Sequence, residues 1–205
     1  MADIYLLDVR AQKAPLLSLL DSVSPSRREK ALKMRKESAR LCCIGAEVCL
    51  SCALNLPLPL NLKTAENGKP YLENGPEFNI SHSGDLVACA VGQNSVGVDT
   101  ERISRMKASV FNRIASPLEK EKALSFQGGE LLEYYCTVWT KKESLLKLSG
   151  EGIRKELAGV CTESASEHFY TQRLGDYLLS LCTSEAEDVC VHYITEEILK
   201  QKFNI

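Results

Sequence analysis

Apolar and polar positions divide the first half of the chain into a few clear segments. Residues 3–9 form a short, mostly apolar run, which predicts a strand in the protein interior. Residues 16–20 predict a short helix. Ser24-Pro25 then predicts the start of a longer helix, because serine favours the N-cap and proline the first helical position. We expect this helix to continue to about Ala53, with one face packed against the rest of the protein.

The remainder of this half predicts turns and strands. Asn67-Gly68 favours a turn, and residues 78–81 predict a short strand. Residues 86–91 are almost continuously apolar, which is typical of a strand that is buried on both faces. Residues 96–100 follow a further turn and predict another strand. One long helix is therefore followed by three consecutive strands.

The second half of the chain repeats this order of elements. Ser116-Pro117 again predicts a helix start, here with Glu119 at the position that completes a capping box. A long helix is expected over residues 131–149, with Gly150 as its end. Three more strands are predicted, at residues 168–173, 177–182 and 189–194. Because a helix followed by three strands occurs twice, we expect two similar halves.

Composition and charge narrow the class of protein. The 205 residues are 44% hydrophobic and 25% charged, which is ordinary for a globular protein and sufficient for one domain or two small ones. A formal net charge of −2 gives no indication of a nucleic-acid partner. No apolar run reaches the ~18 residues of a membrane span, and the N-terminus lacks the pattern of a signal peptide. We therefore expect a cytoplasmic protein that binds neither nucleic acid nor membranes.

The nine cysteines are consistent with this location. Their number is odd and their spacing irregular, so we expect them to be reduced and mostly buried. The Cys49-x-x-Cys52 pair leaves a redox or metal role open, although no second pair of this kind accompanies it. Several of the others lie in apolar runs, namely Cys42, Cys43, Cys89, Cys182 and Cys190.

Two carboxylates stand at the end of the strand predicted at residues 96–100. Asp99 and Glu101 are two positions apart, so on a strand their side chains point to the same face. Carboxylate oxygens are hard ligands that suit Mg²⁺ or Mn²⁺ better than zinc. The alternative is a strand that runs into a solvated turn with ordinary surface acids.

The second long helix supplies another acid and a base. Trp139, Glu143 and Lys147 recur every four residues and share one helix face. The alternative here is a surface ion pair of small energetic value. Taken with Asp99 and Glu101, however, Glu143 completes a set of three oxygen ligands for a divalent cation. Lys147, one turn further on, can neutralise phosphate charge.

Basic and polar residues in the first half suit an anionic ligand. Residues 24–40 carry seven basic side chains against two acidic ones, which favours a small anion or an acidic partner over a polyanion, with a solvated helix face as the alternative. Ser81 and His82 stand at a strand end, where polar groups can meet a ligand. Candidate phosphate partners are Arg27, Lys30, Arg40 and Lys69.

Four motifs occur in a specific order along the chain. They are Gly68-Lys69-Pro70, Phe78-Asn79-Ile80-Ser81-His82-Ser83-Gly84, Gly97-Val98-Asp99-Thr100-Glu101 and Trp139-Thr140-Lys141-Lys142-Glu143-Ser144-x-x-Lys147. Together they resemble the motifs of the 4′-phosphopantetheinyl transferases, and more specifically of the type that activates surfactin synthetase. The similarity extends to Ser24-Pro25-x-Arg27-Arg28-Glu29-Lys30, while the C-terminal third matches only in pattern.

The resemblance implies a fold and a ligand. The fold is α+β, with two similar halves related by a pseudo-twofold axis, each with a long helix packed on a three-stranded, mainly antiparallel sheet. Residues 1–100 would form the half on the 3′-phosphate and adenine side of coenzyme A and carry the first metal ligand. Residues 101–205 would supply the remaining metal ligands, Lys147 and the carrier-docking surface. Coenzyme A is expected between the halves of a monomer.

The resemblance also assigns roles to individual residues. Mg²⁺, or alternatively Mn²⁺, would be held by Asp99, Glu101 and Glu143. Residues matching Arg27, Lys30, Arg40 and His82 meet the 3′-phosphate end of the cofactor, although the alignment through residues 33–40 needs a gap. Lys69-Pro70 lies on the adenine side. The full set expected at coenzyme A is Arg27, Lys30, Arg40, Gly68, Lys69, Pro70, Ser81, His82, Asp99, Glu143 and Lys147.

The implied reaction transfers the phosphopantetheine arm of coenzyme A to a serine of an apo acyl or peptidyl carrier protein and releases adenosine 3′,5′-bisphosphate. Glu143 is the first candidate for the base, with Asp99, Glu101 and Lys147 completing the catalytic set. Glu119 is a second candidate, although a capping box explains it equally well. Residues 103–115 offer a basic and apolar surface for the carrier, with a plain linker as the alternative. Two other functions stay open: a different Mg²⁺-dependent phosphotransferase or phosphohydrolase, and a non-catalytic module that binds coenzyme A or a carrier.

Overall fold

The computed structural model describes residues 1–150 and 157–205, which form two compact units. Unit 1 comprises residues 1–93 and 188–205, and unit 2 comprises residues 94–187. These bounds differ from the halves expected at residues 1–100 and 101–205. The reason is strand pairing at long range in the sequence. The strand that carries Asp99 pairs within unit 2, and the C-terminal end of the chain returns to unit 1.

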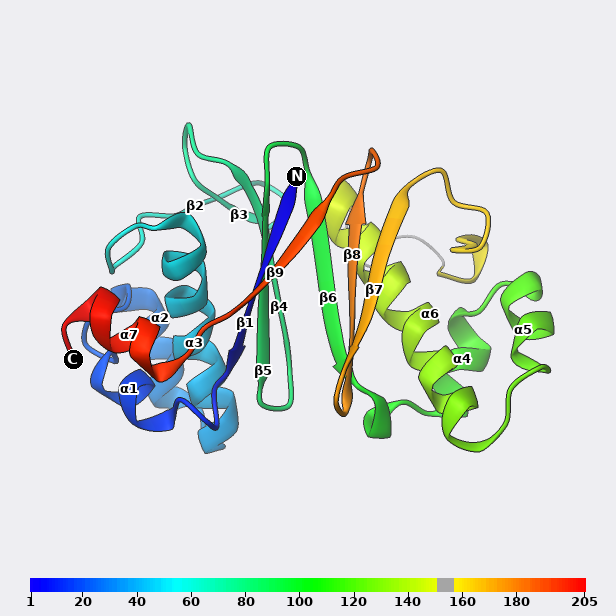
Figure 1. Ribbon diagram of the computed structural model, residues 1–205, viewed down its shortest axis with the longest axis horizontal. Helices are drawn as coiled ribbons and strands as arrows, with labels where there is room; N and C mark the ends of the chain where they lie inside the picture. Colours follow the sequence, from blue (N-terminus) through cyan, green and yellow to red (C-terminus); the bar gives the residue numbers. More distant parts are fainter. Residues whose placement is uncertain (151–156) are drawn as a thin grey trace. The chain divides into compact units, whose positions relative to one another are not determined.

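Unit 1 is built on a four-stranded sheet (Figure 1). Its strands are β1 (Ala2–Asp8), β4 (Glu77–Ser83), β5 (Leu86–Gly92) and β9 (Val189–Tyr193), in the order β4-β5-β1-β9. The first three are antiparallel, whereas β9 pairs with β1 in parallel. The sequence predicted β9 as a strand but assigned it to the other half. In Figure 1, β9, near the red end of the colour range, lies beside the blue β1.

The helices of unit 1 correct one prediction. The sequence indicates a single helix from Ser24 to about Ala53, but the structure has two, α2 (Pro25–Lys33) and α3 (Glu37–Leu54). The chain is extended at Met34 and Lys36, which breaks the helix. The break lets α2 pack back against α3 and bury Ala31, which one straight helix would not allow.

The long helix α3 provides much of the core of unit 1. It packs against β1 and β5, with Ile44 and Val48 among the fully buried side chains. The unit is completed by α1 (Lys13–Ser18), α7 (Glu196–Phe203) and a two-stranded hairpin of β2 (Lys63–Thr64) and β3 (Pro70–Tyr71).

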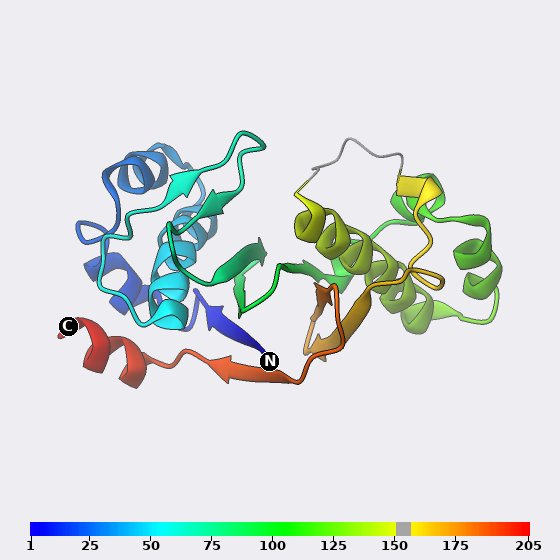
Figure 2. The same cartoon turned by 90° about the horizontal axis from the view of Figure 1, so that it is seen from above.

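Unit 2 has a three-stranded antiparallel sheet in the order β6-β8-β7. The strands are β6 (Val96–Arg102), β7 (His168–Leu174) and β8 (Tyr177–Thr183). The long helix α6 (Gly128–Ser149) packs along one face of this sheet, against β6 and β8 (Figure 2). It ends at Gly150, which has the left-handed backbone conformation expected of a helix terminator.

Short helices complete the described part of unit 2. They are η1 (Ile103–Arg105), α4 (Ala108–Ile114), α5 (Pro117–Ala123) and η2 (Leu157–Gly159). The predicted α+β class with antiparallel sheets is confirmed, and so are two long helices that each cover a sheet. The two main sheets have four and three strands rather than three and three, because unit 1 gains both β1 and β9 while β6 pairs within unit 2.

The cysteines are free thiols, and the buried ones include Cys42, Cys43, Cys49, Cys89 and Cys182. The prediction that the cysteines are mostly buried is confirmed, and Cys190, on edge strand β9, is the exposed one among them. Over residues 1–150 and 157–205, no helix combines the length and apolarity that crossing a membrane requires.

Candidate active site

Strand β6 and helix α6 approach each other closely because of Gly97. On β6, Gly97, Asp99 and Glu101 alternate with Val98 and Thr100, so these three share one strand face. A Cβ atom at position 97 would overlap the backbone carbonyl oxygen of Ser144 in α6. Only glycine therefore permits this contact. It brings the helix face that carries Glu143 and Lys147 against the strand.

Asp99 and Lys147 form the central ion pair of the site. Lys147 Nζ donates to Asp99 Oδ1 at 2.6 Å and to the Val98 carbonyl oxygen at 3.1 Å. Asp99 is buried and Lys147 half-buried, so water screens the pair only in part. An ammonium group carries three N–H donors, which leaves one donor on Lys147 for a ligand.

Glu143 lies one helical turn before Lys147 and is half-buried. Its Oε1 atom is buried and has no hydrogen-bond partner in the described part of the chain. Burial raises the pKa of Glu143, the negative charge of Asp99 raises it further, and Lys147 opposes the shift. Two carboxylates against one ammonium group thus leave local negative charge that a cation would offset.

Glu101 stands at the edge of this site. Its Oε1 accepts a hydrogen bond from the Arg102 backbone N–H at 2.9 Å and lies 3.8 Å from Arg105 Nη1. The structure therefore brings Asp99, Glu143 and Lys147 together, while Glu101, on the same strand face, interacts with Arg105.

The acidic side chains of this site suit a hard divalent cation. The ligand types are carboxylates, and the unpartnered Glu143 oxygen is the kind of atom that a metal ion satisfies. Within the described residues, no three acidic, histidine or cysteine side chains are already gathered as a metal cluster. Asp99 is instead bonded to Lys147, whose positive charge lies against this carboxylate.

Glu119 has a structural position. It is fully buried, and both of its oxygens are used. Oε2 accepts from the Ser116 N–H and pairs with Lys142 Nζ at 2.8 Å, while Oε1 accepts from Thr162 N and Oγ1. Burial alone would raise the pKa of Glu119, but the hydrogen bonds from Lys142, Thr162 and Ser116 hold it below its ordinary value. The predicted capping box is confirmed.

Lys142 is a residue that sequence reasoning missed. Its side chain is fully buried, and Nζ donates to three carbonyl oxygens, those of Ile114, Leu157 and Val160, at 2.5–2.9 Å. It therefore ties α6 to the end of α4 and to the segment that begins at η2. Its place in the sequence between two charged residues, Lys141 and Glu143, gives no sign of this burial.

The basic residues expected at a phosphate lie at the junction of α2 and α3 in unit 1. Arg27 donates from Nη1 to the Cys43 carbonyl oxygen at 3.0 Å and pairs through Nε with Glu47. Arg40 donates to the Met34 carbonyl oxygen, and its buried Nε has no partner among the described residues. Lys30 is exposed.

The other expected ligand residues of unit 1 lie on β4 and on the β2–β3 hairpin. Gly68 has φ +85°, which a glycine adopts without strain, and it forms the tip of the turn. Lys69 and Pro70 line a cavity of about 220 Å³, in which Lys69 pairs with Glu77 at 3.3 Å. On β4, Ser81 is buried and His82 is exposed.

The surface expected to meet a carrier is only partly available. Met106 and Phe111 are buried in the core of unit 2, so the expectation that they offer an apolar docking surface is wrong. The basic residues of the same segment, Arg105, Lys107 and Arg113, are exposed.

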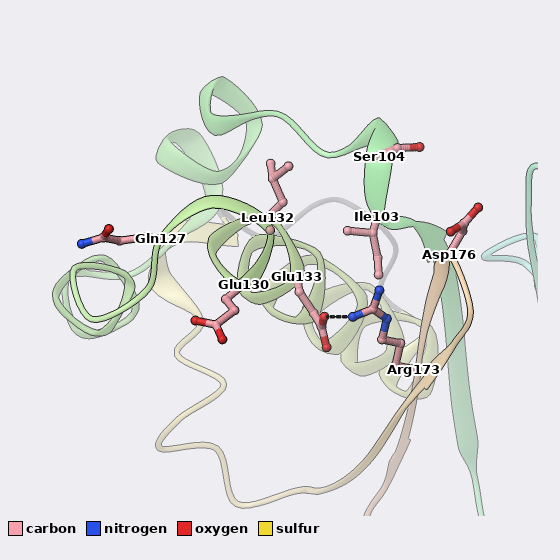
Figure 3. Close-up of a pocket in the computed structure, with 9 residues that line it drawn as sticks. Ile103, Ser104, Gln127, Glu130, Leu132, Glu133, Arg173 and Asp176 are labelled. Atoms are coloured by element: carbon pink, nitrogen blue, oxygen red, sulfur yellow. Dashed lines mark hydrogen bonds and ion pairs between the residues drawn. The ribbon is translucent and has the colours of Figure 1, made fainter.

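A larger cavity of unit 2 was not predicted from the sequence. It measures about 520 Å³ and lies between the start of α6 and the turn that follows β6, where Figure 3 shows Leu132 and Ile103. Arg173 reaches across it from β7 to Glu133 of α6, with Nη1 2.7 Å from Oε2 (Figure 3). Charged residues outnumber apolar ones in its lining, and they come from segments far apart in the sequence.

Fold and site together define an α+β protein with a carboxylate and lysine cluster on a strand and a long helix. The sequence pattern of the 4′-phosphopantetheinyl transferase superfamily matches residues 95–196, which include this whole cluster. The chain is also 31% identical over 146 residues to the 4′-phosphopantetheinyl transferase AcpT of Salmonella typhimurium, a match that covers 68% of this chain and 74% of that protein. The chain belongs to the 4′-phosphopantetheinyl transferase superfamily.

Relatives from Bacillus agree with the type that the motifs predict. The chain is 31% identical over 139 residues to the 4′-phosphopantetheinyl transferase Sfp of Bacillus subtilis, and 30% identical over 142 residues to another 4′-phosphopantetheinyl transferase of that species. The matches cover 64% and 66% of this chain. They span 62% and 63% of those relatives, less than two thirds of their length.

Proposed function

We propose that this protein transfers the 4′-phosphopantetheine moiety of coenzyme A to a serine of an apo acyl or peptidyl carrier protein and releases adenosine 3′,5′-bisphosphate. The observation that carries the proposal is the cluster of Asp99, Glu143 and Lys147, which lies inside the segment that matches the superfamily. The three relatives described above are 4′-phosphopantetheinyl transferases, which supports the same activity.

The acidic residues of this cluster are the proposed ligands of Mg²⁺, with Mn²⁺ as the alternative. Asp99, Glu101 and Glu143 would hold the ion. A bound divalent cation supplies charge neutralisation for the pyrophosphate of coenzyme A. Two observations support this assignment. Glu143 Oε1 has no hydrogen-bond partner among the described residues, and the negative charge of Asp99 raises the pKa of Glu143. Both indicate that the site has too little positive charge to balance its carboxylates.

Lys147 is proposed to bind the pyrophosphate. Two of its three N–H donors are directed to Asp99 and Val98, which fixes the ammonium group in place. The third donor is available to a phosphate oxygen. A fixed positive charge at that point stabilises the negative charge that develops on the leaving oxygen, and it needs no reorganisation during the reaction.

Glu143 is proposed as the base that accepts the serine proton. A base must have a free lone pair and a proton affinity suited to the task. Glu143 Oε1 has no partner in the described part of the chain, and the carboxylate has a second oxygen, so one oxygen can face the cation while the other accepts the proton. Glu119 lacks both properties, since its two oxygens are occupied and its pKa is lowered. We therefore assign the base role to Glu143.

The basic residues of unit 1 are proposed to bind the nucleotide end of coenzyme A. Arg27 and Arg40 suit a phosphate, because each guanidinium group retains donors that the described residues do not use. The cavity beside the β2–β3 hairpin is proposed for the adenine side. The full proposed set in this unit is Arg27, Lys30, Arg40, Gly68, Lys69, Pro70, Ser81 and His82.

Three further properties belong to the proposal. The protein acts as a monomer in the cytoplasm. It recognises an acidic carrier through the exposed Arg105, Lys107 and Arg113, since opposite charge steers association.

The test is a panel of apo-carriers incubated with the protein, coenzyme A and Mg²⁺, followed by mass spectrometry of each carrier. The proposal predicts that at least one carrier gains the mass of phosphopantetheine, with an equal amount of adenosine 3′,5′-bisphosphate released. Hydrolysis of coenzyme A with no adduct would indicate a phosphohydrolase. Binding of coenzyme A with neither product would indicate a non-catalytic module. Either of those results would contradict the proposal.

A further inference from the structure

Glu47 is a buried carboxylate that the proposed chemistry does not use. It lies in the middle of α3 and is 2% exposed. Its Oε1 accepts hydrogen bonds from the backbone N–H groups of Ser24 at 2.9 Å and Leu60 at 3.0 Å. Its Oε2 accepts from Ser24 Oγ at 2.7 Å and pairs with Arg27 Nε at 3.1 Å. Three hydrogen bonds and one ion pair offset the cost of burying this charge.

These contacts attach the first turn of α2 to α3. Ser24 is the N-cap of α2, yet its hydroxyl donates to Glu47 and does not cap its own helix. The start of α2 is therefore held by a carboxylate from α3 and not by a local cap. Arg27 lies in that first turn, so the same carboxylate fixes both the backbone and the guanidinium group of Arg27.

The guanidinium group of Arg27 is held along one edge. Its Nε forms an ion pair with Glu47 at 3.1 Å, and its Nη1 donates to the Cys43 carbonyl oxygen at 3.0 Å. A guanidinium group has five N–H donors in a planar fork, so three remain beyond these two. The side chain is 26% exposed, which leaves a ligand access to the group.

We propose that Glu47 is a positioning residue that holds Arg27 in the orientation that binds the 3′-phosphate of coenzyme A; this inference rests on the proposed function. A free arginine side chain loses much rotamer freedom when it binds an anion. Arg27 has already lost that freedom in the folded protein. Binding of the phosphate therefore costs less entropy and uses a fork that is already oriented.

Glu47 has two opposite effects on phosphate binding by Arg27: it orients the guanidinium group, which favours binding, and its negative charge opposes binding. A carboxylate behind Arg27 weakens the attraction of the guanidinium group for a phosphate. Two substitutions separate the effects. Glu47→Gln removes the charge and weakens the bond to Arg27, whereas Glu47→Asp keeps the charge but shortens the side chain by one methylene. If orientation dominates, both substitutions weaken phosphate binding. If charge dominates, Glu47→Gln strengthens it.

The experiment compares coenzyme A with 3′-dephospho-coenzyme A, which lacks the group that Arg27 is proposed to bind. Glu47→Gln and Glu47→Asp are expected to raise the KM for coenzyme A by about fivefold to tenfold and the KM for the dephospho form by less than about twofold. Combining Glu47→Gln with Arg27→Met should add nothing to Arg27→Met alone, because Glu47 acts through Arg27. If the KM values for the two substrates rose by the same factor, or if their ratio stayed at the wild-type value, the inference would be overturned.

A matched control separates positioning from simple stabilisation. Ser24→Ala removes one hydrogen bond to Glu47 but leaves the bond between Glu47 and Arg27. It should lower the melting temperature and leave the ratio of the two KM values unchanged. If Ser24→Ala changes the ratio as much as Glu47→Gln does, the role of Glu47 is structural and the inference fails.

Equilibrium binding covers variants that turn over too slowly to assay. Adenosine 3′,5′-bisphosphate and adenosine 5′-monophosphate are titrated into each folded variant. Glu47→Asp, the milder change, should lose affinity for the bisphosphate and keep its affinity for the monophosphate, and equal loss would contradict the inference. Failure of the proposed function is a separate result, since the wild-type protein would then modify no carrier.

Discussion

Each unit contains a short helix that begins with Ser-Pro and is held by a buried glutamate and its cationic partner. The two units differ in which of these residues lies on the short helix and which lies on the long one. In unit 1 the glutamate, Glu47, belongs to the long helix, and the cation, Arg27, to the short one. In unit 2 the glutamate, Glu119, belongs to the short helix, and the cation, Lys142, to the long one.

The two arrangements differ in how far the cation is exposed to solvent. Lys142 is fully buried and forms an ion pair with Glu119, and its three N–H donors go to three carbonyl oxygens, which leaves it none for a ligand. Arg27 is partly exposed and retains donors. The same type of pair thus serves only the fold in unit 2, whereas in unit 1 it also holds a side chain that can bind an anion.

In each unit a glycine allows the long helix to pack closely on the sheet, but the glycine lies on the helix in unit 1 and on the strand in unit 2. In unit 1 the glycine is Gly45 on α3, and a Cβ there would come 2.8 Å from Val9 Cγ1, a side-chain atom. In unit 2 the glycine is Gly97 on β6, and a Cβ there would overlap the backbone of α6 at Ser144. A side chain can move aside, but a helix backbone cannot without displacing the residues that it carries.

The largest effect on stability is expected for Lys142→Met. This substitution leaves the buried Glu119 without its positive partner and three carbonyl oxygens without a donor. Loss of one partner of a buried ion pair typically costs about 3–5 kcal/mol. Denaturant unfolding measures the change. The neighbouring half-buried Lys141→Met is the control and should cost less than about 1 kcal/mol. Similar losses for the two variants would contradict the assignment.

Gly97→Ala should destabilise the protein more than Gly45→Ala does. Overpacking that forces a backbone to shift costs about 1–3 kcal/mol or more, whereas displaced side-chain tips cost less and alanine favours a helix. Gly97→Ala should also reduce the turnover rate, because it moves the α6 backbone beside Lys147. Thermal unfolding and initial rates check both expectations. If the two variants lost the same stability and activity, the backbones of β6 and α6 would not be in close contact at Gly97.

Glu119→Gln is expected to change how stability depends on pH. The pKa of Glu119 is lower in the folded protein than its ordinary value. Such a carboxylate stabilises the fold above its unfolded pKa of about 4, and this contribution is lost as the pH falls through the folded value. The wild type should therefore lose stability more steeply below about pH 4 than Glu119→Gln does. Exposed Glu130→Gln is the control, and its unfolding curve should follow the wild type at each pH.

The smallest effect on stability is expected for Arg27→Met. Glu47 keeps its three hydrogen bonds in this variant, and Arg27, the lost partner of its ion pair, is partly exposed. We expect a loss of about 1 kcal/mol in the free energy of unfolding, together with weaker binding of adenosine 3′,5′-bisphosphate. If Arg27→Met lowered the free energy of unfolding as much as Lys142→Met does under the same conditions, the proposed difference between the two ion pairs would be wrong.

Much of the fold follows from local pattern. The strands around Asp99, the helix that ends at Gly150 and the capping box at Ser116 were predicted, because periodicity, helix termini and capping residues act over a few positions. The break after α2 and the parallel pairing of β9 were missed. They depend on packing between segments far apart in the chain, which no local pattern records.

The site shows the same limit. The resemblance identified Asp99, Glu143 and Lys147, which the structure brings together. The buried partners Glu47 and Lys142 gave no signal, because a charged residue in a helix normally predicts a solvated face. Their burial depends on donors and acceptors that arrive from other elements, such as Leu60 and Val160.

The central claim is that the carboxylate cluster of unit 2 performs phosphopantetheinyl transfer, and Asp99→Ala tests it most directly. The measurement is the fraction of apo-carrier converted to holo-carrier, by mass, with saturating coenzyme A and Mg²⁺ and with a carrier that the wild-type protein modifies. A folded Asp99→Ala variant is expected to form essentially no holo-carrier. If that variant, with an unfolding transition close to that of the wild type, kept more than a few per cent of the activity, Asp99 would not belong to the active site.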